Sequence, residues 1–446
     1  MTPSLFGTDG VRGHAGRPPM DGDTAYRLAR ATSDHLRHLT GRAPKLVLGM
    51  DTRRSSPMLA HAFTAGACTR GAHVTWTGVL PTPGVAFLTR HRRADAGVVI
   101  SASHNPFEDN GIKLFDGEGR KLADDATAAI ERRLQGGADD EPDATGADIG
   151  SSDRYDRREG AYRAFLLGHA PYLDGLRVAL DCANGAASQV APEVFRRIGA
   201  RMDVIHASPD GVNVNAGCGS THPDAIRTHV RAHGLDVGVT FDGDADRVQL
   251  VDRKGRLVTG DHVIAIVARV RGDREVVATV MTNLGAERWM NDHGITVHRT
   301  QVGDRHVDAE LRQRGLRLGG EQSGHVLFLD KASTGDGILS ALQLLAAVRA
   351  SGRPLEAWMD DIPTYPQTLR NVPVPDGEKT AVTQHPDVRD AIAGIETEFG
   401  DEVRVNLRPS GTEALVRVMV TAPDEARLER VAGQLEDLLR RLDVGA

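Results

Sequence analysis

Four short segments, rich in glycine, hydroxyl and charged residues, contain the side chains that one phosphoryl-transfer reaction needs. In chain order they offer a serine, carboxylates for a hard cation, hydroxyl-binding groups, and a loop that can hold a phosphate. No single segment would support this interpretation, but the four are complementary. They are Ser101–Pro106, Asp242–Arg247, Gly320–His325 and Arg408–Glu413.

The second segment predicts a cation site. Asp242, Asp244 and Asp246 follow an alternating apolar run, so they stand where a strand leaves its sheet. Three carboxylates at this spacing can converge on one ion, and an all-oxygen set suits Mg²⁺. An EF-hand is excluded because its sixth and twelfth positions would be Arg247 and Arg253 rather than Gly and Glu. A solvated acidic turn is the alternative, and the preceding strand favours the metal. Arg247 is included among the catalytic candidates.

The first segment presents a serine at another strand end, because Ser101 and Ser103 directly follow the apolar run 96–100. No G-x-S-x-G elbow surrounds them, so an acyl-transfer triad is unsupported. A phosphorylated serine would instead carry nearly two negative charges and could complete the cation's shell. His104 and Lys113 are candidates for acid–base work, Lys113 if neighbouring positive charge lowers its pKa. The alternative for His104 is an ordinary turn residue.

The fourth segment resembles a phosphate cradle. A guanidinium, two hydroxyls and backbone N–H groups could converge on phosphate oxygens, with a second arginine as a clamp. Because Pro-Ser-Gly is also a plain turn sequence, a simple turn is the alternative. The candidate residues are Arg408, Ser410, Gly411, Thr412 and Arg417.

The third segment and the N-terminus supply further binding candidates. Glu321, Ser323 and His325 suit hydroxyl recognition, and Glu321 could accept hydrogen bonds from two adjacent hydroxyls. A buried structural carboxylate is an equal alternative for Glu321. Thr8 and Arg12 are additional phosphate contacts.

These segments must be positioned by sheets, because one supersecondary unit recurs along the chain. A strand, loop, helix, glycine and second strand begin at Leu46, Arg177 and Val276. Glycine stands where each helix must end with positive φ. Strands that alternate with helices predict mixed or parallel sheets covered on both faces, with ligands at the carboxyl ends of the strands. We expect all motif loops except the last to lie there.

The C-terminal part differs from these three units. It contains helical stretches at Val388–Glu398 and Glu425–Leu442, and strands near Val403–Leu407 and Leu415–Val420. The apolar face of the last helix predicts core packing. Candidate boundaries are the Gly- and Asp-rich segment 135–154 and the Pro-rich segment 365–379. The predicted fold is α/β, with three similar domains with mixed sheets and a smaller C-terminal α+β domain around a central cleft. The domains are 1–152, 153–253, 254–366 and 367–446.

Composition excludes several classes of protein. With 61 acidic and 54 basic residues of mixed sign, the chain has no basic stripe for nucleic acid. Cys68, Cys182 and Cys218 are odd in number and lack a CxxC spacing, which argues against a disulfide framework and a zinc site. No run of about 18 apolar residues occurs. We therefore expect a cytoplasmic protein that does not bind membranes.

With these residues assembled, the chain resembles the α-D-phosphohexomutase superfamily over nearly its whole length, and within it the bacterial phosphoglucosamine mutases. It keeps the family order of serine, metal, sugar and phosphate loops, one per domain. The segments that resemble the glucosamine branch are Phe6–Gly13, Ser101–Lys113, Gly217–Pro223, Val302–Arg305 and Gln322. The chain differs from the usual family pattern at three positions, Met50, Ser56 and Ala414. Ala414 lies beside the phosphate loop and bears on substrate preference.

The resemblance implies that Ser103 is the phosphoserine and that Mg²⁺ binds its phosphoryl group together with Asp242, Asp244 and Asp246. It also implies that phospho-Ser103 donates to O1 of glucosamine 6-phosphate. A sugar 1,6-bisphosphate then turns around, and O6 returns the phosphoryl group to the serine. The product, glucosamine 1-phosphate, is a precursor of UDP-N-acetylglucosamine and peptidoglycan. A mobile fourth domain would close over the substrate and exclude water.

Three alternatives remain at this point. The first is phosphoglucomutase or phosphomannomutase activity, whose sugar substrates differ from glucosamine phosphate in the substituent at C2. A metal-dependent serine phosphatase would not need separate phosphate and sugar loops. A non-catalytic sensor would not need the serine and every aspartate. The expected partner is a small phosphosugar, and the sequence is compatible with a homodimer.

Overall fold

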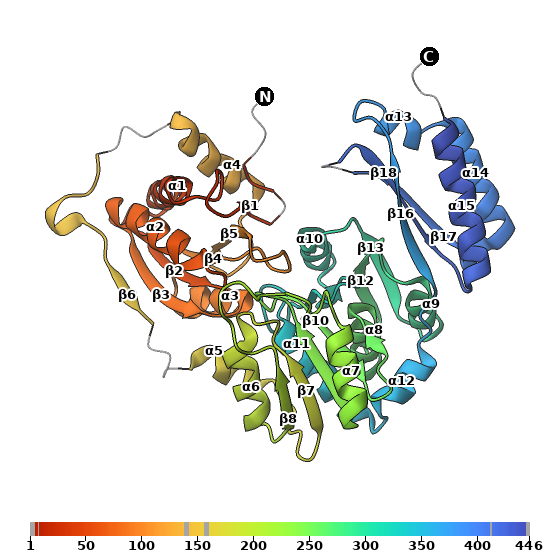
Figure 1. The fold of residues 1–446 in the computed structure, drawn as a ribbon. Coiled ribbons are helices and arrows are strands. Elements are labelled where there is room, and N and C mark those ends of the chain that lie inside the picture. Colours follow the sequence, from red (N-terminus) through yellow and green to blue (C-terminus); the bar gives the residue numbers. More distant parts are fainter. Residues whose placement is uncertain (1–4, 8, 138–141, 156–159, 411–412, 443–446) are drawn as a thin grey trace.

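The computed structural model describes residues 5–7, 9–137, 142–155, 160–410 and 413–442. Four sheets follow one another along the chain, and we call each sheet with its helices a unit. In Figure 1 the first unit (red to orange) and the fourth (blue) face each other above the second and third. This arrangement confirms the predicted fold class of three α/β units and a smaller α+β unit.

The first unit has a six-stranded mixed sheet in the order β1-β5-β4-β2-β3-β6. Its strands are β1 (Val11–His14), β2 (Lys45–Met50), β3 (His73–Val79), β4 (Ala96–Ile100), β5 (Asp109–Asp116) and β6 (Ser152–Arg154). Its helices are α1 (Gly22–Thr40), α2 (Ser56–Thr69), α3 (Thr82–His91) and α4 (Asp124–Arg132). Separate apolar clusters lie on the α1/α2 side and the α3 side, so both faces of the sheet are covered.

The second sheet is also mixed, in the order β11-β10-β9-β7-β8. Its strands are β7 (Arg177–Asp181), β8 (Arg201–Ile205), β9 (Val237–Phe241), β10 (Val248–Asp252) and β11 (Leu257–Val258). The helices are α5 (Ala161–Gly168), α6 (Ala187–Arg197) and α7 (Asp224–His233). Since β7 runs parallel to both β8 and β9, the loops after these three strands meet at one edge of the sheet.

The third unit shares its hydrophobic core with the second. Its sheet has the order β13-β12-β14-β15. The strands are β12 (Glu275–Thr279), β13 (Thr296–Thr300), β14 (Leu318–Gly320) and β15 (Val326–Phe328). The helices are α8 (Gly260–Arg271), α9 (Leu284–Asp292), α10 (Asp304–Arg314), α11 (Gly337–Ser351) and α12 (Leu355–Asp361). Phe195 and Phe241 of the second unit and Ile264 and Leu342 of the third belong to one buried cluster. The two units therefore pack as one body.

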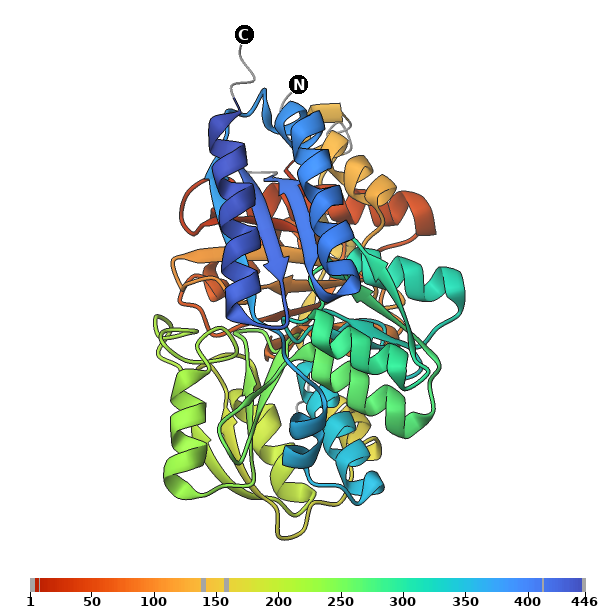
Figure 2. The same cartoon turned by 90° about the vertical axis from the view of Figure 1, so that its right-hand side faces the viewer.

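The fourth unit is an antiparallel sheet, β16-β18-β17, covered by helices on one face. Its strands are β16 (Gln367–Pro373), β17 (Arg404–Pro409) and β18 (Leu415–Thr421). The helices are α13 (Lys379–Thr383), α14 (Pro386–Phe399) and α15 (Glu425–Arg441). Figure 2 shows α14 and α15 on the outer side of this sheet, so the other face is turned toward the first unit.

Two predicted linkers contain strands. Segment 365–379 includes β16, and segment 135–154 includes β6. Both strands lie at sheet edges, where missing N–H groups and polar side chains are tolerated. This explains why Pro373 can sit in β16. The predicted core face of the last helix is confirmed, because Leu428, Val431 and Leu435 are buried against the sheet. Among the described residues, no helix is long and apolar enough to cross a membrane.

Candidate active site

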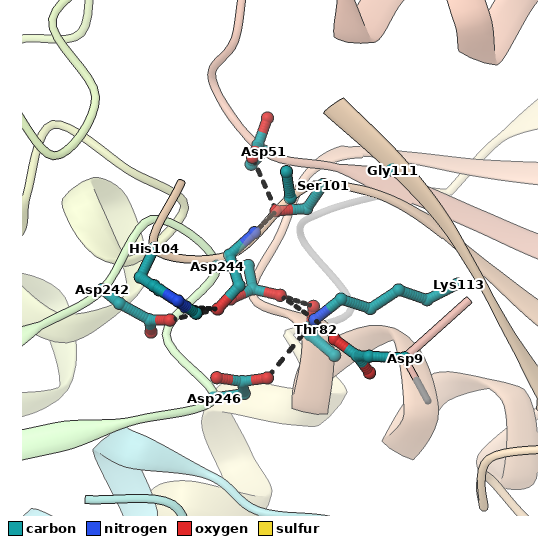
Figure 3. Close-up of polar contacts among 12 residues, drawn as sticks. Asp9, Asp51, Thr82, Ser101, His104, Gly111, Lys113, Asp242, Asp244 and Asp246 are labelled. Carbon is teal, nitrogen blue, oxygen red and sulfur yellow. Dashed lines mark hydrogen bonds and ion pairs between the residues drawn. The ribbon is translucent and has the colours of Figure 1, made fainter. Parts of the chain in front are cut away.

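Ser103 follows the end of β4, and its hydroxyl contacts the aspartate loop that follows β9. Figure 3 shows Asp242, Asp244 and Asp246 of this loop near His104 and Lys113. The Ser103 side chain is buried, and its backbone is left-handed with φ 55°. The Oγ donates a hydrogen bond of 2.5 Å to Oδ2 of Asp242. It also lies 3.4 Å from Nδ1 of His104. The fold thus joins the first two predicted motifs, which are 139 residues apart in the chain.

A buried scaffold holds this serine loop. The hydroxyl of Ser101 accepts from the Ser103 N–H at 2.9 Å and donates to Asp51 Oδ2 at 2.6 Å. Arg53 is fully buried and donates from Nε to the same Asp51 oxygen at 2.8 Å. Its Nη2 donates to the carbonyl oxygens of Ser103 and Asn105. Asp51 and Arg53 were not predicted as site residues. Their position at the end of β2, next to β4, is the signal that could have found them.

The aspartate loop is built to hold a cation. Single carboxylate oxygens of Asp242, Asp244 and Asp246 lie within 4.8 Å of one another, and all three residues are buried. Oδ1 of Asp244 and Oδ1 of Asp246 make no hydrogen bond. Burial and the like charges of Asp246 and Asp244 raise the pKa of Asp242 well above its usual value. Buried carboxylates that repel one another and have oxygens without hydrogen bonds fit Mg²⁺, which would bind these carboxylates and neutralise them.

Backbone contacts from two helices fix the loop's shape. At the start of α3, the Thr82 N–H donates to the Asp244 carbonyl at 2.9 Å, and its Oγ1 donates to Asp244 Oδ2 at 2.6 Å. At the start of α11, the Gly337 N–H donates to the Ala245 carbonyl at 3.0 Å. A Cβ at Gly337 would lie 2.4 Å from the Arg247 carbonyl, so this approach requires glycine. The carboxylates are therefore held rigidly by all three α/β units.

Lys113 is a buried cation, and the lowered pKa that its role as a base required is not found. Its Nζ lies 2.8 Å from Asp244 Oδ2, 3.1 Å from Asp9 Oδ2 and 3.3 Å from Asp246 Oδ2. Burial disfavours its charge, but the carboxylates outweigh burial and raise the pKa of Lys113 well above its usual value. The sequence did not reveal that three anions surround this amine. The carboxylates thus favour the protonated form of Lys113.

His104 has the opposite environment. Burial, followed by the positive charges of Arg247 and Arg12, lowers its pKa to about 4. The ring is therefore neutral near pH 7 and can accept a proton. Arg247 places Nε 3.9 Å from Asp246 Oδ1, and its N–H donates to Asp242 Oδ1 at 3.2 Å. Two predicted catalytic residues, His104 and Arg247, thus lie beside the serine and the aspartates.

A chain of charged residues extends from the aspartates. Lys121 forms ion pairs with Asp9 and with Asp304, the latter at 2.5 Å. His325 bridges this chain to the aspartate loop, with Nε2 3.4 Å from Asp304 Oδ2 and Nδ1 3.7 Å from Asp246 Oδ1. Although burial opposes it, Asp246 raises the pKa of His325. Asp9, Lys121 and Asp304 were missed as site residues. Asp9 and Asp304 do lie in segments that carried the family resemblance.

A cavity of about 450 Å³ lies beside this chain, between the loop after β5 and helix α10. Lys121 and Asp304 line it together with Arg120, Arg305 and Arg312. Its volume suits a small ligand, and its lining contains four basic and four acidic side chains, so its charges balance. The cavity thus continues the candidate site toward the third unit.

The predicted hydroxyl-binding residues follow β14. Glu321 is almost fully buried, and its Oε1 accepts from the Gly303 N–H at 3.0 Å. Ser323 is half-buried. Gln322 donates to Oε1 of Gln367 at 3.1 Å, which connects this loop to the fourth unit. Of the two carboxylate oxygens of Glu321, Oε1 is therefore already bonded to the backbone of Gly303.

The predicted phosphate-binding arginines lie on the inner face of the fourth sheet. Val416 and Val418 pack against the helices, so Arg417 between them points to the other face. Arg408 is paired with Arg417 across the strands. Burial and the charge of Arg417 lower the pKa of Arg408. Two adjacent guanidinium groups on the face turned toward the first unit suit an anion.

Some predicted residues are not brought into the serine and aspartate cluster. Among the described residues, no hydrogen bond or ion pair joins Arg408, Ser410 or Arg417 to the aspartates, and Arg417 pairs with Glu413 at 2.7 Å. Arg12 is nearer, because its Nη1 donates to the Ala102 carbonyl at 3.4 Å. The remaining predictions, Thr8, Gly411 and Thr412, lie outside the described residues.

Family models match each of the four units. Residues 3–140, 168–255 and 259–365 match phosphoglucomutase/phosphomannomutase alpha/beta/alpha domains I, II and III, and residues 369–438 match the C-terminal domain of that family. This chain belongs to the phosphoglucomutase/phosphomannomutase family. The four segments Ser101–Pro106, Asp242–Arg247, Gly320–His325 and Arg408–Glu413 therefore lie in separate domains of one family fold.

Curated relatives of the family support a narrower assignment. A phosphoglucosamine mutase from Deinococcus deserti is 51% identical over 96% of this chain and 96% of its own length. Those from Deinococcus radiodurans and Thermus thermophilus are 49% and 47% identical, and each match covers at least 95% of both chains.

Solved structures have the same fold. A phosphoglucomutase/phosphomannomutase family protein from Burkholderia thailandensis matches with a TM-score of 0.83 and 25% identity, over 99% of this chain and 98% of its own. An N-acetylphosphoglucosamine mutase from Aspergillus fumigatus, solved with GlcNAc-6P and magnesium, matches with a TM-score of 0.70 and 17% identity, over 98% and 95%.

Proposed function

We propose that this protein is a phosphoglucosamine mutase, which interconverts glucosamine 6-phosphate and glucosamine 1-phosphate through phospho-Ser103 and a 1,6-bisphosphate. The observation that carries the proposal is the 2.5 Å contact between the Ser103 hydroxyl and Asp242 of the aspartate loop. It occurs in a chain whose curated relatives at 47–51% identity bear this name.

The aspartates prepare the site for phosphoryl transfer. In this proposal Asp242, Asp244 and Asp246 would hold Mg²⁺, which would supply positive charge against the transferring phosphoryl group. Lys113 keeps its proton, and its positive charge offsets the negative charges of Asp244 and Asp246 through their Oδ2 atoms. The rigid loop geometry holds these charges in place before the reaction, which is the main contribution that an enzyme makes to phosphoryl transfer.

Proton transfer is assigned to His104. The sugar hydroxyl attacks phosphorus, and the bond from phosphorus to Ser103 Oγ breaks. The hydroxyl proton passes to the neutral His104 ring, which returns it to the departing Ser103 Oγ. The position of His104 supports this role, because its Nδ1 lies 3.4 Å from Ser103 Oγ, and its lowered pKa leaves the ring unprotonated before the reaction. In the second half of the cycle the bisphosphate returns a phosphoryl group to Ser103. Arg247 is assigned to charge balance beside the aspartates.

Substrate binding is assigned to the remaining predicted residues. Glu321, Ser323 and His325 would recognise the sugar. The non-reacting phosphate would bind the fourth unit, where Arg408 and Arg417 lie together on the inner face. The other phosphate contacts in this proposal are Thr8, Arg12, Ser410, Gly411 and Thr412. A cytoplasmic location and a homodimer also remain part of the proposal.

The test compares kcat/KM for the 6-phosphates of glucosamine, glucose and mannose, with Mg²⁺ and a trace of sugar 1,6-bisphosphate. A clear preference for the amino sugar is expected. Equal or better rates with glucose or mannose would leave the mutase chemistry standing but reject the glucosamine assignment. Release of inorganic phosphate without a sugar 1-phosphate would reject the mutase altogether. The Ser103→Ala variant is measured in parallel.

A further inference from the structure

A second group of possible metal ligands lies at the edge of the second sheet. Asp181 ends β7, His206 follows β8, and Cys218 lies in the connection from β8 to α7. One ligand atom from each residue lies within 4.8 Å of the others. Asp181 and Cys218 are buried, whereas His206 is partly exposed. None of these residues belongs to the Asp242 loop, so they form a separate cluster.

The ring nitrogen of His206 has no hydrogen-bond partner in this cluster. Its Nδ1 is shielded from solvent and makes no hydrogen bond, although it lies only 3.1 Å from Oδ1 of Asp181. Bonds of about 2.0 Å to a tetrahedral cation would place neighbouring nitrogen and oxygen ligands about 3.3 Å apart. The observed separation matches this spacing, and a cation between the two atoms would satisfy both.

Hydrogen bonds from the backbone already orient the carboxylate. Oδ1 of Asp181 accepts from the Ala183 N–H at 2.9 Å, and Oδ2 accepts from the Gly219 N–H at 3.0 Å. The side-chain amide of Asn184 lies 4.0 Å from Sγ of Cys218. Outer contacts of this kind orient ligands and support affinity in metal sites. The ligands are therefore arranged before any cation binds.

We propose that Asp181, His206 and Cys218 form a binding site for Zn²⁺ or a similar divalent cation that accepts thiolate ligands. One oxygen, one nitrogen and one sulfur suit such a cation, whereas Mg²⁺ prefers oxygen ligands alone. Binding replaces the thiol proton of Cys218, which passes to solvent. The absence of a CxxC spacing argued against a zinc site, but that argument applies only to sites built from cysteines close together in the sequence. Here the fold assembles ligands from three separate loops.

A cation bound at this site would also stabilise the loop that contains Ser103. A bound cation would tie the ends of β7 and β8 to the connection that contains Asn215. The side-chain amide of Asn215 donates to the carbonyl oxygens of Ser103 and Asn105, at 2.9 and 3.1 Å. A cation that binds only the folded protein stabilises it by mass action. The bound cation is therefore expected to raise the melting temperature of the protein.

The experiment uses Co²⁺ as a spectroscopic probe. The full-length protein is stripped with a chelator, placed in excess Mg²⁺ to occupy the aspartate loop, and titrated with Co²⁺. One equivalent is expected to produce a sulfur-to-cobalt charge-transfer band, which Zn²⁺ removes. Cys218→Ser should abolish the band because serine is nearly isosteric but has no sulfur. His206→Asn should weaken Co²⁺ binding at least tenfold, and asparagine tolerates the left-handed backbone at this position, φ 48°.

Two matched variants control for other ligands. Cys68→Ser removes a thiol on α2, and His229→Ala disrupts the more exposed group Asp203, His229 and His233. Both should keep the band at the wild-type affinity. The proposal is overturned if folded wild-type protein gives no sulfur band, or if the band survives in Cys218→Ser. If Cys218→Ser does not fold, unchanged Co²⁺ affinity in His206→Asn overturns it equally.

Discussion

Replacing Arg53 with methionine removes the buried guanidinium that supports the serine loop. The side chain is inaccessible to solvent and pairs with the equally buried Asp51. It also donates to the carbonyl oxygens of Ser103, Asn105 and Asp109, at 2.9, 2.7 and 3.0 Å. Methionine fills a similar volume but makes none of these contacts. The variant therefore tests a support that lies behind the catalytic serine and does not touch the substrate.

The expected loss of stability is large. Removing one partner of a buried ion pair typically costs about 3–5 kcal/mol, because the other charge stays buried and unpaired. In a unit of roughly 150 residues, each kcal/mol lowers the melting temperature by about 2–4 °C. The transition of the first unit should therefore fall by roughly 6–20 °C. We also expect a lower kcat, because the carbonyls that shape the serine loop lose their donor.

Differential scanning calorimetry of the full chain measures this shift, and a mutase assay measures kcat. The matched control is Arg54→Met, which makes the same change at the neighbouring, exposed arginine. Exposed substitutions usually change stability by less than about 0.5 kcal/mol. The double variant Asp51→Asn with Arg53→Met removes both charges and should be more stable than Arg53→Met alone. If Arg53→Met melts no earlier than Arg54→Met, the buried pair does not support the loop.

Three further predictions concern the reacting groups. Ser103→Ala should lower kcat on the order of a thousandfold or more while the protein still folds, and near-normal turnover would refute the phosphoserine route. Asp244→Asn should weaken Mg²⁺ binding, measured by calorimetric titration, by at least about tenfold, and unchanged affinity would remove Asp244 from the metal site. The pKa of His104 is lowered from 6.5 to about 4, so its contribution to stability is complete above pH 6.5 and falls as pH drops toward 4. Melting temperatures across this range should decline less steeply in His104→Gln than in wild type.

Local patterns predicted the architecture well. Apolar runs followed by helical stretches and glycines indicated strands at Leu46, Arg177 and Val276, and β2, β7 and β12 occupy these positions. Such patterns depend on residues close in the chain, so they can be read without the fold. Edge strands were harder, because β6 and β16 are polar or contain proline and look like linkers. The core shared by the second and third units was also not predicted, since packing between distant helices leaves no local signal.

The sequence by itself determined which chemistry the protein carries. Serine, carboxylates, an imidazole and arginines stand in loops directly after predicted strands, and strand ends are where an α/β sheet collects its ligands. This reasoning selected the Ser101–Ser103 turn and the three aspartates, and the family resemblance then chose Ser103 between the two serines. The structure brings Ser103 into contact with the aspartate loop.

Only the tertiary structure decided how these groups are charged and supported. Lys113 is surrounded by Asp9, Asp244 and Asp246, which come from two distant segments of the chain, and this environment raises its pKa, whereas a role as a base required a lowered one. Arg53 likewise reaches carbonyls about fifty residues away. Electrostatic and hydrogen-bond energies depend on distances of a few ångströms, and folding sets those distances between residues that are remote in sequence.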